Sequence, residues 1–356
     1  MYVDISTKQF TRFTQNSVFQ LPQRWDGDNF YLTIQKLFDK YLQEIKQHIS
    51  SSDYLNIECI CLWIKESIDL YFQGLTENAF AKFGEAMELL IKNPLKIYSD
   101  TGWMDPFFDN DSQLKLYRVR NVQQNKLYSR KDIFHTPYNL RSKVATCRYS
   151  IAGCPSLYLG TSLDLCCEES QKTSMTELQI ASKFELMTEL KNADNRIEVI
   201  ELAVKPQDFI GEANKDEKQP HKRIFKGMKL LNVKTSGNYL YWYPLIAACS
   251  YIRVSKKDPF AAEYLIPQFL MQWVRKQSLK GEVYGIRYFS CASVRASNMG
   301  CNYVFPASGE RSPKDENFCK ILSRAFSLTI PQYIHEYNLI SDCENALKND
   351  VYLEYI

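Results

Sequence analysis

The chain has 356 residues, of which 45% are hydrophobic and 24% charged, with 13 Gly and 13 Pro. This composition excludes collagen-like, low-complexity and disordered proteins, and the length suffices for one large domain or two ordinary ones. The net charge is only +3. No nucleic acid is therefore expected as a partner, because a polyanion is normally met by a strongly basic surface.

The 11 cysteines are scattered and odd in number, and the first residues lack the basic and apolar regions of a secretory signal. We therefore expect free thiols and a cytoplasmic protein. The longest apolar run, 241–249, is far shorter than the roughly 20 residues that span a bilayer, so no membrane partner is expected. With four histidines and no C-x-x-C pair, the chain predicts no metal site.

Three segments in the first hundred residues carry apolar side chains at helical spacing, which predicts a small bundle of amphipathic helices. The residues are Phe30, Ile34, Leu37, Phe38, Tyr41, Leu42 and Ile45, then Ile57, Ile60, Cys61, Ile64 and Ile68, then Phe80, Phe83, Met87 and Leu90. A polar, turn-rich stretch, 99–112, follows. We therefore predict a helical bundle over 1–111 and a second domain over 112–356.

The second domain mixes short β-like runs with helical segments, so the predicted class is α+β. The runs are 114–120, 156–160, 196–204, 283–288 and 303–305. Asp258-Pro259 resembles an N-cap followed by a first-turn proline, which predicts a helix over 260–266. Pro267 is expected either to kink this helix or to begin a second one. Residues 211–223 and 308–316 have loop composition.

One segment, 147–169, gathers a cation, an aromatic ring and an acid. It begins with a polar turn that holds Arg148 and continues as a short strand that carries Tyr158. A Thr/Ser cap then opens a helix that presents Glu168 or Glu169 about two turns in. In an ordinary helix these acids would lie on a solvated face, and Tyr158 would be core.

Two further residues complete the candidate set. Arg118 shares a strand face with Leu114 and Leu116, and a cation turned inward needs an anionic partner, either a ligand or a structural glutamate. Ser290 ends the run 284–290, which is followed by a neighbouring strand at 302–306. His135 is the histidine nearest this set, and a satisfied structural histidine is its simplest interpretation.

These motifs together resemble the RES domain, a family named for its Arg, Glu and Ser. The resemblance rests on Leu116-Tyr-Arg118, on R-Y-S at 148–150 with G-x-P-x-L-Y-L-x-T-S at 153–162, on E-Y-L-I-P-Q at 263–268, and on G-I-R-Y-x-S ending at Ser290. It covers roughly residues 112–310 with the motifs in order. The N-terminal helices fall outside it.

The resemblance implies a core similar to ADP-ribosyltransferases that consumes NAD as substrate and needs no metal. It implies that Arg118 and Arg148 hold the phosphates, Tyr158 stacks on the nicotinamide, Glu169 stabilises the ribosyl cation and Ser290 orients the substrate. Glu168 remains the rival of Glu169, because the two lie about 100° apart on a helix and only one can face the site.

The implied function is cleavage of the nicotinamide–ribose bond of NAD, by a hydrolase or a phosphorylase, in a toxin or phage-defence effector that depletes cellular NAD. Two alternatives stay open: an ADP-ribosyltransferase acting on a macromolecule, and a non-catalytic binding module. The resemblance also implies an antitoxin or regulatory partner, bound through the N-terminal helices, as in toxin-antitoxin pairs. Those helices could equally form a homo-oligomer.

Overall fold

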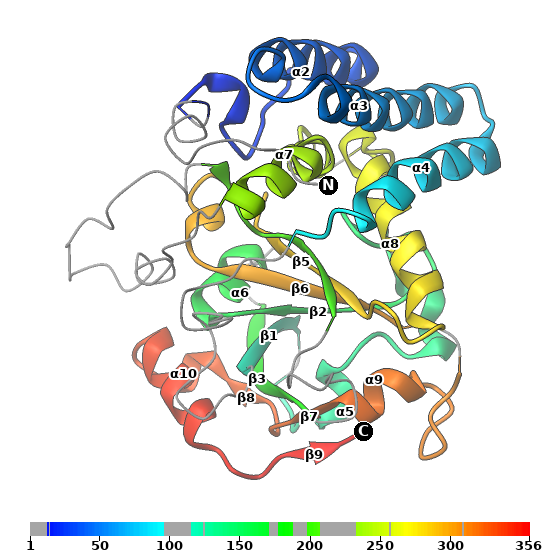
Figure 1. The fold of residues 1–356 in the computed structure, drawn as a ribbon. Coiled ribbons are helices and arrows are strands. Elements are labelled where there is room, and N and C mark those ends of the chain that lie inside the picture. Colours follow the sequence, from blue (N-terminus) through cyan, green and yellow to red (C-terminus); the bar gives the residue numbers. More distant parts are fainter. Residues whose placement is uncertain are drawn as a thin grey trace. The chain divides into compact units, whose positions relative to one another are not determined.

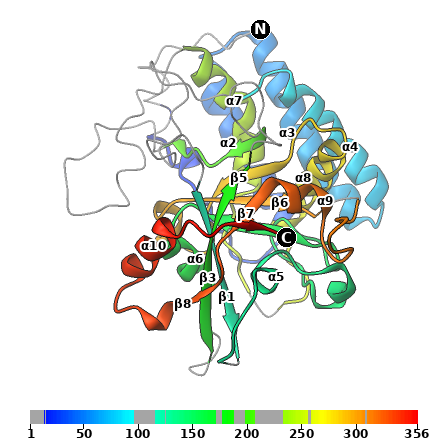
Figure 2. The ribbon, with the colours of Figure 1, turned by 90° about the horizontal axis from the view of Figure 1, so that it is seen from below.

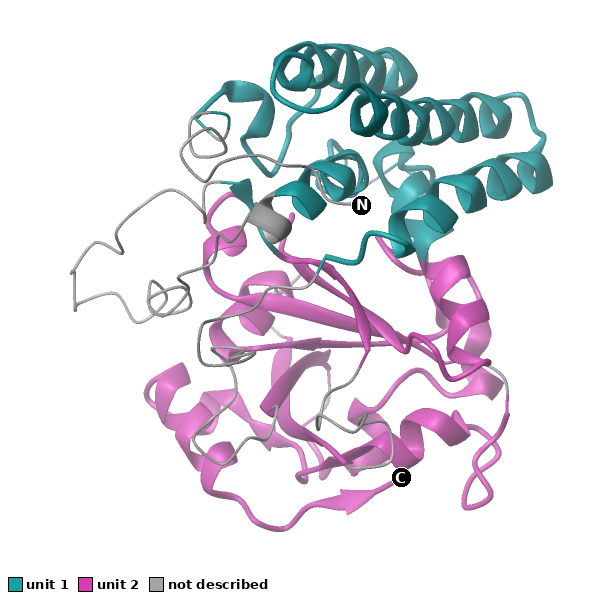
Figure 3. Ribbon diagram, viewed as in Figure 1, with its two compact units in different colours: residues 1–104, 204–270 teal, residues 105–203, 271–356 magenta. Residues whose placement is uncertain are grey.

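The computed structural model describes residues 13, 15–95, 115–123, 125–170, 177–187, 198–206, 233–255, 258–307 and 310–356, with the side chains of 233–236 left out. Its helices and mixed sheet confirm the α+β class (Figure 1). The chain forms two compact units: Met1–Met104 with Val204–Leu270, and Asp105–Ala203 with Met271–Ile356 (Figure 3). Each unit is described by itself below.

Unit 1 contains the three predicted helices, α2 (Phe30–Ile45), α3 (Ser51–Phe72) and α4 (Thr76–Ile91). Asn29 caps α2 by accepting the Leu32 N–H, and Ser50 caps α3 by accepting the Asp53 N–H. The apolar side chains listed above at helical spacing are nearly all buried. None of the helices described here is both long and apolar enough to cross a bilayer.

A fourth helix, α7 (Val233–Ala248), belongs to the same unit and contacts α3. Its described side chains are buried almost all round, as expected of a central helix. Hydrogen bonds join α7 to the other helices of the unit. The Tyr41 hydroxyl donates to the Leu240 carbonyl at 2.6 Å, and the Tyr241 hydroxyl donates to Asp53 Oδ1 at 2.8 Å. These contacts explain why residues 204–270 join the N-terminal helices, whereas the sequence placed a single boundary after residue 111.

Unit 2 is built on strands β1 (Lys115–Val122), β2 (Ser156–Gly160), β3 (Leu178–Leu186), β4 (Val199–Leu202), β5 (Gly285–Phe289), β6 (Cys301–Pro306), β7 (Phe326–Leu328), β8 (Gln332–Tyr333) and β9 (Glu354–Tyr355). The order is β4-β5-β6-β2-β1-β3-β7-β9, with β8 also on β3. Only the β4–β5 pair is parallel among these strands. The predicted pairing of the 284–290 and 302–306 runs is confirmed as β5–β6.

The sheet narrows to one registered pair where β1 meets β2, with Tyr117 opposite Gly160. Beyond that pair β1 diverges from β2, so the sheet consists in effect of two parts joined at one point. Helix α6 (Leu163–Glu169) contacts both strands there, and α10 (Ile340–Asn349) contacts α6. Figure 2 shows α10 and the short α5 (Arg130–Ile133) on opposite sides of β1 and β3.

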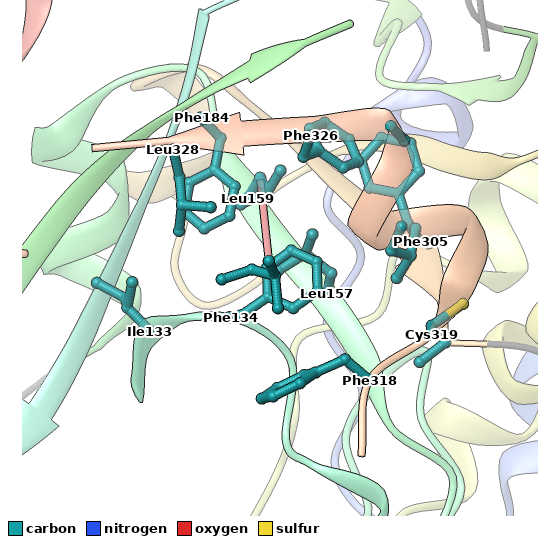
Figure 4. Close-up of a cluster of buried hydrophobic side chains, with 14 of the residues drawn as sticks. Ile133, Phe134, Leu157, Leu159, Phe184, Phe305, Phe318, Cys319, Phe326 and Leu328 are labelled. Atoms are coloured by element: carbon teal, nitrogen blue, oxygen red, sulfur yellow. The ribbon is translucent and has the colours of Figure 1, made fainter. Parts of the chain in front are cut away.

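The main core of unit 2 lies on the α5 side of the sheet and is rich in Phe. It includes Phe134, Leu157, Phe184, Phe305 and Phe326 (Figure 4). The α9 helix (Lys320–Ala325) contributes Leu322 to the same cluster. A smaller cluster on the other face packs Tyr117 and Val119 against α6 and α10. Because side chains alternate along a strand, the two clusters hold β1 from both sides.

His135 is fully buried at the edge of the main core and fully hydrogen-bonded. Its Nε2 accepts the Cys319 N–H at 2.9 Å, so its Nδ1–H donates to the Thr136 carbonyl, also at 2.9 Å. The ring is therefore neutral, and burial lowers the pKa of His135 to about 4. The structural interpretation of this histidine matches its surroundings.

We expect this histidine to make unit 2 less stable at acidic pH. Between its folded pKa of about 4 and its unfolded value near 6.5, the unfolded chain binds the extra proton, so the free energy of unfolding falls as pH falls, by about 3 kcal/mol in all. Urea titrations from pH 7.5 to 4 should show a steeper loss for wild type than for His135→Gln. The exposed His335→Gln is the matched control, and equal slopes in all three proteins would contradict the assignment.

One local prediction needs correction, and another falls on residues that the structure does not describe. No helix begins at Asp258-Pro259: a 3-10 turn covers Ala262–Tyr264, and α8 runs over Leu265–Ser278. Pro267 therefore lies in the first turn of α8, where its missing N–H is harmless and no kink is needed. The loop 211–223 falls outside the described residues, and residues 310–316 are irregular as expected.

Candidate functional site

The helix that carries the two candidate acids is fixed at its start by four contacts. Ser162 is its N-cap, accepting the Leu165 N–H at 3.2 Å and donating to the Met299 carbonyl at 3.2 Å. Thr161 exchanges hydrogen bonds with Cys301 of β6, at 3.0 and 2.9 Å. These contacts confirm the predicted Thr/Ser cap and tie α6 to the strand that follows Ser290.

Close packing of α6 on the sheet depends on a glycine at the end of β2. A Cβ atom on Gly160 would lie 2.6 Å from Cys166 Sγ, so a larger residue would push the helix away. The Cys166 thiol in turn donates to the Tyr117 carbonyl of β1 at 3.3 Å. The helix is thereby held over the junction of β1 and β2, and its last residue is Glu169.

Glu169, rather than Glu168, has its carboxylate against the neighbouring strands. Asn302 of β6 donates its Nδ2–H to Glu169 Oε1 at 2.7 Å, and the Ser290 hydroxyl donates a second hydrogen bond. Arg148 lies within electrostatic reach of the same carboxylate. The structure therefore brings together the acid, the serine and one arginine that the sequence singled out.

Opposing influences set the protonation of this carboxylate. Residue Glu169 as a whole is exposed, yet protein atoms surround its carboxyl group closely, and this burial raises its pKa above the ordinary value. Hydrogen bonds from Ser290 and Asn302 and the charge of Arg148 act the other way. An acid that is accessible but desolvated, with donors aimed at it, is typical of a functional carboxylate.

Arg148 lies in a tight turn that Tyr158 holds in place. The turn is closed by paired hydrogen bonds between Cys147 and Ser150, at 3.0 and 3.1 Å. The Tyr158 hydroxyl lies 2.8 Å from the Ser150 hydroxyl and accepts the Tyr149 N–H at 3.3 Å. Tyr158 therefore fixes the turn through its hydroxyl, and the residue as a whole is half-buried.

Two buried tyrosines form the wall behind this turn. The rings of Tyr149 and Tyr288 are 4.6 Å apart at an angle of 53°. Burial, with Glu169, Tyr158 and Tyr149 nearby, holds the pKa of Tyr288 well above its ordinary value, and Arg148 opposes the shift. Four groups of the site thus lie within electrostatic reach of Tyr288, which stays a neutral, aromatic surface.

Arg118 is set on β1, within electrostatic reach of Tyr158. Its Nη1–H donates to the Phe134 carbonyl at 3.0 Å, and no carboxylate in the described part of the chain pairs with it. Burial and the nearby Arg120 lower the pKa of Arg118 to about 10. Buried structural ion pairs of this sheet join Arg287 to Glu201, at 2.5 Å, and Lys183 to Glu185, at 3.1 Å. Arg287 directly precedes Tyr288 in β5.

Asn302 is the site residue that sequence reasoning missed. It was included in a predicted strand but given no role. It is 4% exposed among the buried apolar side chains of β6. A buried amide in such a strand requires a hydrogen-bond partner, and that was the available signal.

Comparison with known proteins adds one relative. The chain is 28% identical over 348 residues, 93% of this chain and 72% of the other protein, to "Putative toxin YopC" of Bacillus subtilis (strain 168). No protein-family model matches the chain. No solved structure matches it either. The resemblance to the RES domain therefore stays a prediction.

Proposed function

We propose that this protein is a toxin that cleaves the nicotinamide–ribose bond of NAD. The similarity to a protein named as a toxin supports the first part of the proposal. The observation that carries the second part is the Glu169 carboxylate, held by Ser290 and Asn302 beside Arg148, Tyr158 and Tyr288. Within the described part of the chain, this is one acid among aromatic rings and cations, with no histidine bonded to it.

The chemistry requires little more than these groups. When the C1′–N bond breaks, its electron pair leaves with nicotinamide, which becomes neutral, and positive charge develops on the ribose. The Glu169 carboxylate stabilises that charge, as a carboxylate does in glycoside hydrolysis. Because neutral nicotinamide needs no proton to leave, no general acid is required. Water then adds at C1′ and loses a proton, giving ADP-ribose; phosphate in its place gives the phosphorylated product.

The other side chains bind and orient the dinucleotide. The Tyr158 ring, with Tyr288 behind it, offers an aromatic face to the cationic nicotinamide. Ser290 aligns the acid and the ribose by hydrogen bonding. Arg148 favours the ionised form of Glu169, and Arg118 binds phosphate. No bound metal is invoked.

The test is a product analysis. Purified protein is incubated with NAD, with and without added phosphate, and the products are separated by chromatography with mass detection. Nicotinamide plus ADP-ribose would establish a hydrolase, and a phosphorylated ADP-ribose that appears only with phosphate would establish a phosphorylase. Nicotinamide without free ADP-ribose, with a matching mass gain on a protein, would indicate a transferase. Intact NAD, from folded protein that also leaves NAD unchanged in cells that express it, would overturn the proposal.

A further inference from the structure

Arg120 of β1 was assigned no role by the motifs, yet it forms a matched pair with Arg118. The two residues are two positions apart on one strand, so their side chains leave the same face. Both guanidinium groups donate from Nη1 to carbonyls at the end of α5, Arg118 to Phe134 and Arg120 to Asp132. Each is thereby held in a defined direction.

This pair lacks a counter-ion among the residues that the structure describes. The nearby Asp132 carboxylate faces Ser129, accepting its N–H at 2.8 Å and its hydroxyl at 2.7 Å. The charge of Arg120 opposes that of Arg118, and the groups that favour the Arg118 cation are thiols and a tyrosine, not carboxylates. Two oriented, mutually repelling cations are a site for an anion with more than one charge.

The pair also lies at a defined end of the site. Asn302, which holds Glu169, is opposite Gly160 of β2, and Gly160 is opposite Tyr117 of β1. Arg118 and Arg120 lie farther along β1 and leave the strand on the Leu116 face, opposite to that of Tyr117. Tyr158 is within electrostatic reach of both Arg118 and Tyr288, whereas Arg148 acts on Glu169. Tyr158 therefore links Arg118 with the groups around Glu169, at the point where β1 and β2 diverge.

We propose that Arg118 and Arg120 together bind the pyrophosphate of the substrate, and that Arg120 is the residue that distinguishes phosphorylated from phosphate-free nicotinamide ribosides. The inference deepens the proposed function and rests on it for the identity of the substrate. It moves Arg148 away from the phosphates to the ribose end, beside Glu169. Planar guanidinium groups suit this task because each can bind a phosphate through two parallel hydrogen bonds.

The test measures binding and turnover separately. Calorimetric titration with ADP and with inorganic pyrophosphate should give affinities at least 10-fold weaker for Arg120→Ala than for wild type, with Arg120→Lys between them. Adenosine, which lacks phosphate, should show no such difference. In turnover assays Arg120→Ala should raise the KM for NAD about 10-fold with kcat nearly unchanged, and should leave cleavage of nicotinamide riboside unaltered.

Two control variants separate phosphate binding from a structural effect. Ser129→Ala removes the capping box of α5 but keeps both cations, and Arg311→Ala removes an arginine whose side chain is 66% exposed. Both should bind ADP like wild type. The inference is overturned if Arg120→Ala binds ADP like wild type, if Ser129→Ala weakens binding equally, or if wild type binds neither ADP nor pyrophosphate. ADP binding that follows the expected pattern in a protein that leaves NAD intact would overturn the proposed reaction and keep the phosphate site.

Discussion

Glu169→Gln is expected to lower the rate of NAD cleavage about 10²- to 10³-fold without unfolding the protein, as removal of one electrostatic contact to a developing charge commonly does. The amide has the shape of the carboxylate, and its oxygen can still accept the hydrogen bond from Asn302. What it lacks is the negative charge that would face the ribosyl cation. The measurement is the initial rate of nicotinamide release, with the urea midpoint taken to verify the fold.

Glu168→Gln is the matched control for this variant. The two acids are adjacent on α6, carry the same charge and differ in direction by about 100°. Only Glu169 has its carboxylate bonded to Asn302 and Ser290. Glu168→Gln should therefore retain wild-type activity within a factor of a few. An active Glu169→Gln, or a reversal of the two results, would show that the acid has been assigned to the wrong position.

The sequence predicted best the elements whose apolar side chains recur with a regular period. Helices α2 to α4 have one buried stripe each, and the period of 3.6 is visible in their residues. Helix α7 has no such period because nearly all of its described side chains are buried. It became recognisable only through partners distant in sequence, such as Asp53 and Tyr41. The return of this segment to the N-terminal helices could not be derived from local pattern.

Strand β3 illustrates a second limit. It is the longest strand described, yet it carries buried Ser182 where alternation with Ile180 and Phe184 would place an apolar side chain. On its other face it carries buried Lys183. Lys183 is satisfied by Glu185 at 3.1 Å and by the Asp350 carbonyl at 2.8 Å. The tertiary contact with Asp350 thus permits buried polar residues in a strand that β-propensity alone does not indicate.

The residues of the candidate site were predicted from motifs, and the structure explains why the motifs are spaced as they are. The interval from Tyr158 to Glu169 consists of the end of β2, the two-residue cap and two turns of α6. Its length places the acid at the far end of a helix that begins beside β6. Arg148 and Ser290 come from separate elements, and only the pairing of β2, β5 and β6 brings them to the same place.

The charge of the Glu169 carboxylate in this site depends on its neighbours. Burial alone would favour the neutral acid, and an uncharged Glu169 could not stabilise a cation. In the proposed reaction, Ser290, Asn302 and Arg148 therefore act through their effect on the charge of Glu169. Of these, Arg148 supplies a full charge, so its loss should have the largest consequence.

Arg148→Ala is accordingly expected to lower NAD cleavage about 10- to 100-fold at neutral pH and to shift the pH profile. The cation lowers the pKa of Glu169, so its removal raises that pKa further. Activity requires the carboxylate and is lost as pH falls through the pKa, which means that the acidic limb should move to higher pH. Initial rates from pH 5 to 9 measure this shift, and Arg148→Lys should move the acidic limb part of the way back because it returns the charge.

Arg311→Ala is the control and should leave the pH profile unchanged. In cells, Arg148→Ala should relieve growth inhibition and NAD loss, and Arg311→Ala should not. An acidic limb that stays fixed or moves to lower pH in Arg148→Ala would show that this arginine does not act through Glu169.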